Sequence, residues 1–330
     1  MIVVTGATGH IGNTLVRALL ARGEEVRCLV LPGEDLRPLE GLGVELREGD
    51  VRQREALDRT FRGARVVYHL ASVIDLLPRH AGVMYEVNVG GTRNVVEACL
   101  ACGVERLVYT GSIHALAEPP EGVTMDESAP PDPARIPSHY GKSKALATLE
   151  VLEGVKRGLD AVVVSPSGVV GPHDFRPSDM GRLILDFMRR RLWAYVEGAY
   201  DFVDVRDVAE GHLAACTRGT RGENYILSGE RVTVRQMMEW LAEITGVPAP
   251  RLCLPSWAAR VVEEVSSLWA AVIGGRPRIT RESLRVLKSN SYISHAKATR
   301  ELGYHPRPLR ESLADTVEWF REVGWGAASV

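Results

Sequence analysis

The sequence has few cysteines and no long hydrophobic run, and both shortages exclude classes of protein. Its five cysteines among 330 residues are odd in number and scattered, which argues against a disulfide-stabilised secreted protein and predicts a reducing compartment. No apolar run reaches the ~18 residues of a membrane span. A strand pattern begins at Ile2, where a signal peptide would stand. We therefore expect a cytoplasmic protein without a membrane span.

The sequence also lacks an excess of either charge. Its 40 basic and 42 acidic residues leave a net charge of −2, whereas a nucleic-acid-binding protein usually carries a basic excess or a basic stripe. Cys99 and Cys102 form a single C-x-x-C within an apolar helical pattern, and the nine histidines show no paired spacing. We expect the two cysteines to be buried apolar residues, and neither a metal nor a nucleic acid as ligand.

Apolar strand patterns alternate with helical patterns over the first half of the chain. The expected strands cover 2–5, 26–30, 44–47, 65–69, 106–110 and 161–165, and the expected helices 11–22, 53–62, 80–102 and 138–157. Strands that are apolar throughout and separated by helices predict a parallel sheet covered on both faces. A strand–helix unit at 202–217, a strand at 223–227 and mainly helices over 233–322 are expected to follow. The sequence therefore predicts an α/β fold with a doubly wound parallel sheet.

A glycine-rich stretch, Thr5-Gly-Ala-Thr-Gly-His-Ile-Gly12, follows the first expected strand and opens a helix. Gly6 permits the tight turn, Gly9 lets the backbone approach a pyrophosphate, and Gly12 lets the helix pack on the strand. The start of the helix then offers free N–H groups and a partial positive charge to the phosphates. We expect a dinucleotide to bind here, through Gly6, Thr8, Gly9, His10, Ile11 and Gly12.

The end of the second strand leaves the choice of dinucleotide open. An acid there would bind the ribose hydroxyls of NAD and an arginine would favour the 2′-phosphate of NADP, but Leu31 stands at this position. Arg37 lies within reach of a 2′-phosphate and favours NADP, although it is equally well interpreted as a solvated surface residue. Asp50 and Val51, just past the third strand, are expected to bound the adenine.

Tyr140 and Lys144 stand four residues apart in an expected helix, so their side chains share one face. A free tyrosine has a pKa of ~10 and is a poor base at neutral pH, and a nearby ammonium would lower that pKa. Ser112 follows the fifth strand, at the carboxyl edge of the sheet where ligands bind. The three residues predict hydride-transfer chemistry in which Ser112 polarises a carbonyl oxygen, Tyr140 exchanges the proton, and Lys144 tunes Tyr140 and holds the nicotinamide ribose.

Together these motifs resemble the extended short-chain dehydrogenase/reductase family along nearly the whole chain. The matching stretches are TGATGHIG at 5–12, DV at 50–51, HLAS at 69–72, NVGGTRN at 88–94, YTGS at 109–112, YGKSK at 140–144, PSGVVGP at 166–172 and DFVDVRDVAEGH at 201–212. The resemblance implies a Rossmann-type domain of about seven strands and a smaller, mainly helical substrate domain. We assign residues 1–165 plus 202–230 to the first domain and residues 166–201 plus 231–330 to the second.

The resemblance also implies functional residues. It makes Ser112, Tyr140 and Lys144 the catalytic set, and it adds cofactor contacts at Leu70, Ala71, Ser72, Asn88, Pro166, Gly168 and Val169. Asn88 would support the region of the fourth strand, although from the residues alone it is equally a hydrogen-bonding residue on the side of a helix. Related proteins often pair through a four-helix bundle, so a homodimer built on the helices at 80–102 and 138–157 is a further expectation.

Several residues distinguish the branches of the family. A 4,6-dehydratase usually carries an Asp-Glu pair shortly after the serine, where this chain has Ile113 and His114. Sugar-nucleotide enzymes usually have an asparagine where Ser167 stands and an arginine where Tyr200 stands, and a diphosphate without such donors would be poorly compensated. Arg206 and nearby arginines could substitute for them, although Arg206-Asp207 matches a structural motif found across the family. The chain is more similar to the dihydroflavonol reductase and 3β-hydroxysteroid dehydrogenase branch. The expected substrate contacts are Ile113, His114, Ser167 and His173.

The whole sequence predicts an NAD(P)-dependent oxidoreductase that interconverts a carbonyl and an alcohol on a small, apolar substrate. The apolar pattern at 256–273 predicts core of the substrate domain, with a lid over the substrate or a membrane-associating surface as alternatives. Two other functions stay open: a sugar-nucleotide epimerase that returns the hydride to its own substrate, and a non-catalytic protein that senses the nucleotide.

Overall fold

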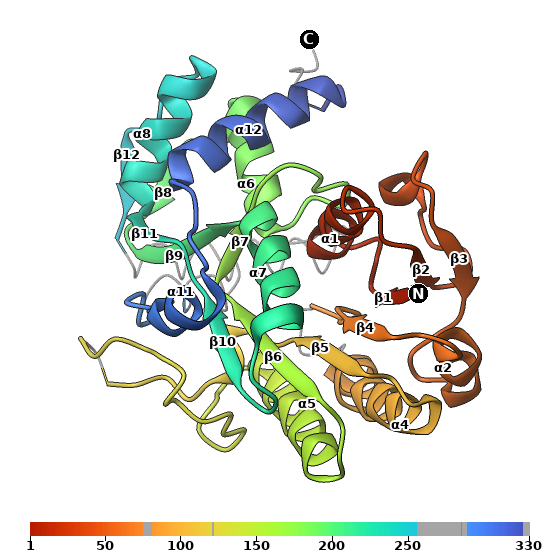
Figure 1. Ribbon diagram of the computed structural model, residues 1–330. Coiled ribbons are helices and arrows are strands. Elements are labelled where there is room, and N and C mark those ends of the chain that lie inside the picture. Colours follow the sequence, from red (N-terminus) through yellow and green to blue (C-terminus); the bar gives the residue numbers. More distant parts are fainter. Residues whose placement is uncertain (75–80, 121, 256–284, 286–288, 326–330) are drawn as a thin grey trace.

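A parallel sheet forms the centre of the protein. The computed structural model describes residues 1–74, 81–120, 122–255, 285 and 289–325, so the pattern at 256–273 lies outside the described residues. The sheet has seven strands in the order β10-β6-β5-β4-β1-β2-β3 (Figure 1). They are β1 (Ile2–Thr5), β2 (Val26–Val30), β3 (Glu45–Glu48), β4 (Val66–His69), β5 (Arg106–Thr110), β6 (Ala161–Pro166) and β10 (Asn224–Leu227). The predicted α/β class and Rossmann-type sheet are confirmed.

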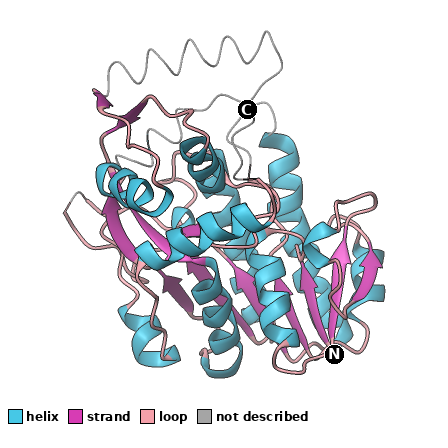
Figure 2. Ribbon diagram, turned by 90° about the horizontal axis from the view of Figure 1, so that it is seen from above, coloured by secondary structure: helices cyan, strands magenta, loops and turns pink. Residues whose placement is uncertain are grey.

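Helices cover both faces of this sheet, and Figure 2 shows them on both sides of the row of strands. One face carries α1 (His10–Leu20) and α7 (Val205–Arg218), and the other carries α2 (Arg54–Phe61), α4 (Thr92–Cys102) and α5 (His139–Lys156). Successive residues of a strand point to opposite faces, so Val4 is buried with Leu15 of α1 and Val3 with Val95 of α4. Each such side chain contributes about 1.5–3 kcal/mol, and together they fix the helices on the sheet.

The strand order reverses at β1, which pairs with β4 on one side and β2 on the other. Loops that leave neighbouring strands at such a switch point turn to opposite faces and leave a crevice at the carboxyl ends of the strands. The glycine loop after β1 and the loop after β4 border this crevice. They touch directly, because the backbone nitrogen of Leu70 donates to the carbonyl oxygen of Thr5 at 3.1 Å.

β3 differs from the apolar strand predicted at 44–47. Three of its four residues are exposed, and it lies at the edge of the sheet. Glu45 pairs with Arg27 of β2 at 2.9 Å and with Arg47 at 2.6 Å. A strand with a neighbour on one side only needs no second apolar face, and charges on such an edge disfavour pairing with another chain.

The helix predicted at 80–102 is one run with a change of pitch. It consists of α3 (Ala81–Tyr85), a π-helical turn η3 (Glu86–Gly91) and α4. π-helical turns are rare in proteins, but those that occur are often found at functional sites. This one carries Asn88, whose side chain bonds to the loop after β4.

A second, smaller core forms where α6 (Asp179–Met188), α8 (Val234–Thr245) and α12 (Leu309–Glu322) pack together, at the top of Figure 1. Two small sheets accompany these helices. They are β7 (Gly168–Val170) with β9 (Ala199–Asp204) and β11 (Glu230–Thr233), and β8 (Ala194–Val196) with β12 (Leu252–Leu254). α11 (Ala296–Leu302) packs against α7. The residue boundaries of the two domains stay a prediction.

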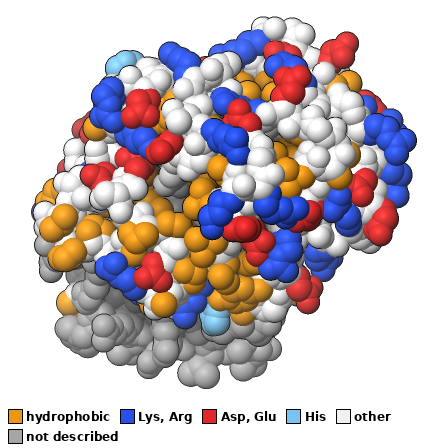
Figure 3. All heavy atoms as spheres, turned by 60° about the horizontal axis from the view of Figure 1, so that its bottom comes forward, with side chains coloured by type: hydrophobic (Ala, Val, Ile, Leu, Met, Phe, Trp, Pro, Cys, Tyr) orange, Lys and Arg blue, Asp and Glu red, His pale blue; other side chains and the backbone are white. Residues whose placement is uncertain are grey.

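The surface charges, the helices and the cysteines can each be compared with what the composition predicts. On the face that Figure 3 shows, basic and acidic side chains are interspersed. Among the described residues, no helix has both the length and the apolarity needed to cross a bilayer. Nor do three potential metal-binding side chains gather at one point in that part of the chain. Cys99 is buried, as predicted, and Cys102 is half-buried, with its thiol donating to the carbonyl oxygen of Asp58 at 3.7 Å.

Candidate active site

The glycine loop between β1 and α1 fits a pyrophosphate. Gly6 adopts a φ of +70°, in the left-handed region, and a Cβ there would lie 2.6 Å from the backbone nitrogen of Ala71. A Cβ on Gly12 would lie 2.1 Å from the carbonyl oxygen of Gly6. Gly9 caps α1 without a side-chain hydrogen bond, so no side chain blocks the N–H groups at the start of the helix. The residues present therefore form the cradle that a dinucleotide needs.

The other residues of the loop connect it to its surroundings. The Thr8 hydroxyl donates to Oε1 of Glu34 at 2.7 Å. His10 donates from Nε2 to the carbonyl oxygen of Pro172 at 2.9 Å, and Ile11 packs against the core beneath α1. His10 thus joins the glycine loop to the segment that follows β7. Whether these three side chains also touch the dinucleotide stays a prediction.

A buried histidine behind the loop was not singled out from the sequence as a functional residue. His69, at the end of β4, accepts at Nδ1 from the Thr5 hydroxyl at 2.7 Å. Its Nε2 donates to Thr92 at 3.0 Å, because the Thr92 hydroxyl proton is engaged by the carbonyl oxygen of Asn88. Burial lowers the pKa of His69 to about 3. The neutral imidazole therefore connects β1, β4 and the helix behind them.

The loop after β4 lies against the glycine loop. The backbone nitrogen of Ala71 donates to Oγ1 of Thr5 at 3.3 Å. The Ser72 hydroxyl donates to Oδ1 of Asn88 at 3.1 Å. Leu70, Ala71 and Ser72 therefore border the crevice in which we expect the dinucleotide.

The end of β2 carries more charge than Leu31 suggests. Leu31 itself is 47% exposed. Arg37 is also exposed and is paired with Asp35 at 2.7 Å, which holds the pKa of Asp35 at about 2. Glu34 lies against the glycine loop, where it also bonds to Arg176 at 3.0 Å.

Asp50 and Val51 lie past β3, as expected. Hydrogen bonds from Arg52, opposed by partial burial, lower the pKa of Asp50. Val51 is buried against the helix opposite, where a Cβ on Gly91 would lie 2.6 Å from its Cγ2. Their contact with the adenine stays a prediction.

Ser112 and Tyr140 come together because α5 packs closely on the turn after β5. Oγ of Ser112 accepts a hydrogen bond from the backbone nitrogen of His114 at 3.2 Å. A Cβ on Gly141 would lie 2.5 Å from the carbonyl oxygen of His114, so glycine permits the approach of the helix. The Ser112 side chain lies close enough to the phenol of Tyr140 to lower its pKa. Gly141 is the residue of this group whose role the sequence did not reveal.

Lys144 lies one turn further along α5 and is buried. Its Nζ donates to the carbonyl oxygen of Thr110 at 2.6 Å and to the hydroxyl of Tyr109 at 3.4 Å. Burial lowers the pKa of Lys144 to about 7. Burial raises the pKa of Tyr140 to about 12, against a smaller lowering by the hydrogen bond with Ser112. This direction is opposite to the lowering expected from a nearby ammonium, because loss of solvation outweighs the neighbouring groups.

Asn88 joins the loop after β4 to the helix that carries Tyr140. Its Oδ1 accepts from the backbone nitrogen of Val73 at 2.8 Å, and its Nδ2 donates to the carbonyl oxygen of Val73 at 3.0 Å. The same Nδ2 donates to Ser143 at 2.9 Å, and the Ser143 hydroxyl donates to the carbonyl oxygen of Tyr140 at 2.8 Å. Asn88 therefore supports the region of β4, as the family resemblance implies, while its contact with the cofactor stays a prediction.

His114 lies between Tyr140 and Tyr200. Its Nε2 lies 2.8 Å from the Tyr200 hydroxyl, and the two rings stack with centroids 6.1 Å apart. The ring of Tyr140 meets His114 edge to face, at 6.4 Å. Burial lowers the pKa of His114 to about 4, and Arg285 adds a smaller lowering. The substrate contacts expected of His114 and of the buried Ile113 stay predictions.

The other predicted residues lie along β6, β7 and the loop that follows. Pro166 ends β6, Ser167 is buried, and Gly168 and Val169 begin β7. A Cβ on Gly168 would lie 2.8 Å from the ring of Phe202, so close packing between β7 and β9 requires this glycine.

His173 is expected to contact substrate, and the structure places it at the start of α1. Its Nδ1 lies 3.5 Å from the Thr14 hydroxyl, and its carbonyl oxygen accepts from Asn13 at 3.1 Å. Its ring meets Trp319 of α12 edge to face, at 6.2 Å. The contacts of His173 with Asn13, Thr14 and Trp319 join α1 to α12, and its substrate contact stays a prediction.

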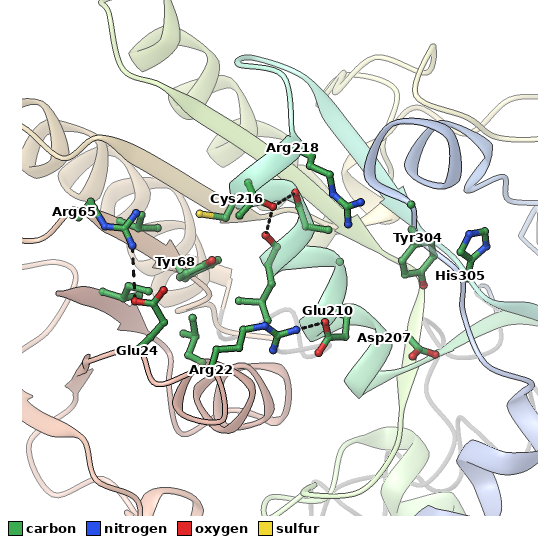
Figure 4. A pocket seen from close by; sticks show the side chains of 18 residues that line it. Arg22, Glu24, Arg65, Tyr68, Asp207, Glu210, Cys216, Arg218, Tyr304 and His305 are labelled. Carbon is green, nitrogen blue, oxygen red and sulfur yellow. Dashed lines mark hydrogen bonds and ion pairs between the residues drawn. The ribbon is translucent and has the colours of Figure 1, made fainter.

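A cavity of about 400 Å³ lies at the opposite, amino-terminal edge of the sheet (Figure 4). It opens between α1, α7 and the residues after α11, and Ile2 and Val66, the first residues of β1 and β4, line it. Arg22 and Glu210 pair beside it at 2.6 Å. Open α/β sheets bind ligands at their carboxyl edge, and the described lining includes none of the predicted site residues. We therefore place the active site at the carboxyl edge.

Comparison with known proteins identifies the class to which this fold and site belong. Residues 2–228 match the family described as NAD dependent epimerase/dehydratase family. The chain belongs to this family, which confirms the resemblance to extended short-chain dehydrogenases/reductases.

Similar proteins span the chain from end to end. It is 40% identical over 324 residues to Sterol demethylase protein B of Methylococcus capsulatus, with 98% of each chain covered. It is 31% identical to the 4-hydroxy-2-methyl-3-oxo-4-farnesyl-3,4-dihydroquinoline-1-oxide ketoreductase of Stigmatella aurantiaca, with 98% of this chain and 97% of that protein covered. The crystal structure of gox2253 superposes with a TM-score of 0.86 at 38% identity, covering 98% of this chain and 99% of that chain.

Proposed function

We propose that this protein is an oxidoreductase that interconverts a carbonyl and an alcohol on a small, apolar substrate with a nicotinamide dinucleotide. The observation that carries the proposal is the grouping of Ser112, Tyr140 and Lys144 at the carboxyl edge of the sheet, beside the glycine loop. Ligands of this fold bind at that edge. A tyrosine beside a serine there provides a proton carrier and a second donor for one substrate oxygen.

The chain offers contacts for each part of the dinucleotide. The loop of Gly6, Gly9 and Gly12 would hold the pyrophosphate, and Lys144 would hold the nicotinamide ribose. Pro166 and its neighbours past β6 are our candidates for the nicotinamide itself. When bound, the dinucleotide supplies or accepts the hydride.

Tyr140 acts as the proton carrier in this proposal. A pKa of about 12 keeps its hydroxyl protonated at neutral pH, as a proton donor to a carbonyl oxygen must be. Ser112 donates a second hydrogen bond to the same oxygen and stabilises the charge that develops there. In the oxidising direction Tyr140 accepts the proton of the alcohol, and the positive charge of protonated Lys144 favours the phenolate.

The surroundings of Tyr140 favour a substrate without a diphosphate. Tyr200 stands where related sugar-nucleotide enzymes carry an arginine, and its hydroxyl is engaged with His114. The lowered pKa of His114 leaves that ring without charge at neutral pH. A diphosphate bound there would lack the arginine that Tyr200 replaces, and Arg285, whose charge acts on His114, is a cation that it would meet instead. The two relatives described above are named for a sterol and for a farnesyl-bearing quinoline, and we infer an apolar, ring-bearing substrate for this chain as well.

The test is absorbance at the reduced-nicotinamide band, with NADH and NADPH in parallel, against steroidal ketones, aryl ketones and aldehydes. We expect net oxidation of the reduced cofactor and oxidation of the matching alcohols in reverse. Conversion of a sugar nucleotide without net redox change would instead support an epimerase. Dinucleotide binding with no turnover of either panel would support a sensor.

A further inference from the structure

Glu34 is an acidic residue just after β2. It stands three residues beyond Leu31, the position where an acid that binds NAD would ordinarily be found. Gly33 adopts a φ of +73° and Glu34 donates from its backbone nitrogen to the carbonyl oxygen of Leu31 at 3.1 Å. This turn brings the Glu34 side chain back, so that Oε2 accepts from the backbone nitrogen of Leu31 at 3.0 Å. Oε1 accepts from the hydroxyl of Thr8 in the glycine loop at 2.7 Å. The carboxylate therefore bridges the strand end and the phosphate loop.

The charges around this carboxylate are compensated in pairs. Arg176, from the segment between β7 and α6, donates to Oε1 of Glu34 at 3.0 Å. Arg37 donates from Nε and Nη2 to Asp35 at 3.0 and 2.7 Å. The formal charges of these four side chains sum to zero, and each of the two arginines is paired with a carboxylate. A 2′-phosphate would bring about −1.5 to −2 charges into this balanced group.

We propose that Glu34 selects NAD over NADP, by accepting hydrogen bonds from the hydroxyls of the adenosine ribose, and that Arg176 moderates this selection by partly neutralising the carboxylate. The inference rests on the proposed function. A carboxylate accepts from neutral hydroxyls and repels a phosphate at the same point. The inference differs from the expectation based on Arg37, because the charge of Arg37 is already bound by Asp35.

The two residues are expected to act with opposite sign. Glu34 supplies the negative charge that excludes the phosphate, so losing it weakens discrimination. Arg176 partly neutralises that charge, so losing it strengthens the repulsion of a phosphate. Arg176 lies in the range 166–201 that we assign to the substrate domain, so cofactor choice would depend on a contact between the two predicted domains.

Equilibrium binding of NAD⁺ and NADP⁺ to the full chain, measured by isothermal titration calorimetry at one salt concentration, tests this without turnover. The wild-type chain is expected to bind NAD⁺ at least about tenfold more tightly, the size of one charged hydrogen bond. Glu34→Gln keeps the shape and removes the charge, and is expected to lower this ratio about tenfold. Arg176→Gln is expected to raise the ratio.

Two further variants separate charge from structure. Glu34→Asp keeps the charge but is too short to reach Thr8, so NAD⁺ binding should weaken while the preference for NAD⁺ persists. Arg37→Gln should leave the ratio unchanged. Thermal unfolding followed by circular dichroism identifies any variant that has lost its fold.

The outcomes that contradict the inference are distinct. A wild-type preference for NADP⁺, or an unchanged ratio in folded Glu34→Gln, overturns the role of Glu34 while dinucleotide binding still supports the proposed function. Loss of NADP⁺ binding in Arg176→Gln overturns the role of Arg176 and makes it a phosphate ligand. A wild-type chain that binds neither dinucleotide overturns the proposed function together with this inference.

Discussion

The side-chain amide of Asn88 donates to the hydroxyl of Ser143 over 2.9 Å, and both residues are buried. Because Ser143 in turn donates to the carbonyl oxygen of Tyr140, this contact continues from the loop after β4 into the first turns of α5. The loop that borders the glycine cradle and the helix that carries Tyr140, our proposed proton carrier, are thereby held in one arrangement. We therefore propose that Asn88 positions Tyr140.

Replacement of Asn88 by alanine should cost both stability and activity. The partners of the amide, the half-buried Val73 and the buried Ser143, would lose their hydrogen bonds, which predicts a loss of about 1–3 kcal/mol in the free energy of unfolding. We also expect kcat to fall more than KM rises, because the change moves Tyr140. Urea unfolding and steady-state kinetics measure the two effects.

Asn94→Ala is the matched control. Asn94 also donates from its amide, to the carbonyl oxygens of Val51 and Arg52, and among the described residues these bonds do not lead to α5. It should retain kcat. An equal loss of kcat in both variants would show that Asn88→Ala acts through general destabilisation and not through the position of Tyr140.

Tyr140→Phe should abolish turnover and leave dinucleotide affinity nearly unchanged. Removal of a general acid typically lowers a rate by about 10²–10⁴-fold, and the ring that packs on His114 is retained. Tyr85→Phe is the control, because the Tyr85 hydroxyl also lies at the start of α5, 3.4 Å from Nδ1 of His139, but has no proposed role. Turnover that survives in Tyr140→Phe would remove the basis of the proposed mechanism.

Gly141→Ala should displace α5 from the turn after β5. The new Cβ would lie 2.5 Å from the carbonyl oxygen of His114. Because this oxygen belongs to the backbone, the clash can be relieved only by moving the helix or the turn, and overpacking of this kind costs about 1–3 kcal/mol. We expect kcat to fall by more than the loss of stability alone would cause, because Tyr140 precedes Gly141 and would be displaced with the helix. In Gly82→Ala the Cβ would meet nothing within 4 Å, so stability and kinetics should stay close to wild type. Thermal unfolding and kcat compare the two variants.

The parts of the protein that were predicted from the sequence depend on short-range patterns. The strands that pair centrally are apolar throughout, and the glycine stretch and the Tyr140–Lys144 spacing each lie within a few residues. Glu34 escaped assignment because a turn at Gly33 returns its side chain to the strand end. The need for glycine at 141 depends on a carbonyl group 27 positions earlier, at His114. Contacts of this kind leave no periodic signal in the sequence.

The pKa of Tyr140 shows a second limit of sequence reasoning. The spacing places an ammonium within reach of the phenol, and that alone predicts a lowered pKa. The opposite direction arises because burial raises the pKa of Tyr140 and also lowers the pKa of Lys144. The degree of burial depends on packing by β5 and its following turn, which is a property of the fold.

Acid should destabilise the protein through two buried histidines. Burial lowers the pKa of His69 to about 3 and of His212 to about 4, from 6.5. At a pH between these lowered pKa values and 6.5, the unfolded chain therefore binds more protons than the folded chain. The free energy of unfolding falls as the pH drops below 6.5. Each histidine adds up to ~1.4 kcal/mol per pH unit to that slope.

His212→Gln isolates one of these contributions. His212 donates from Nδ1 to the carbonyl oxygen of Val208 and accepts at Nε2 from the Thr110 hydroxyl, and a glutamine amide offers the same donor and acceptor without titrating. Urea unfolding at a series of pH values should give the variant a shallower loss of stability below pH 6.5 than the wild type. His305→Gln, at an exposed position, should keep the wild-type slope. Equal slopes for wild type and His212→Gln would mean that His212 becomes protonated without unfolding, contrary to the burial that the fold imposes on it.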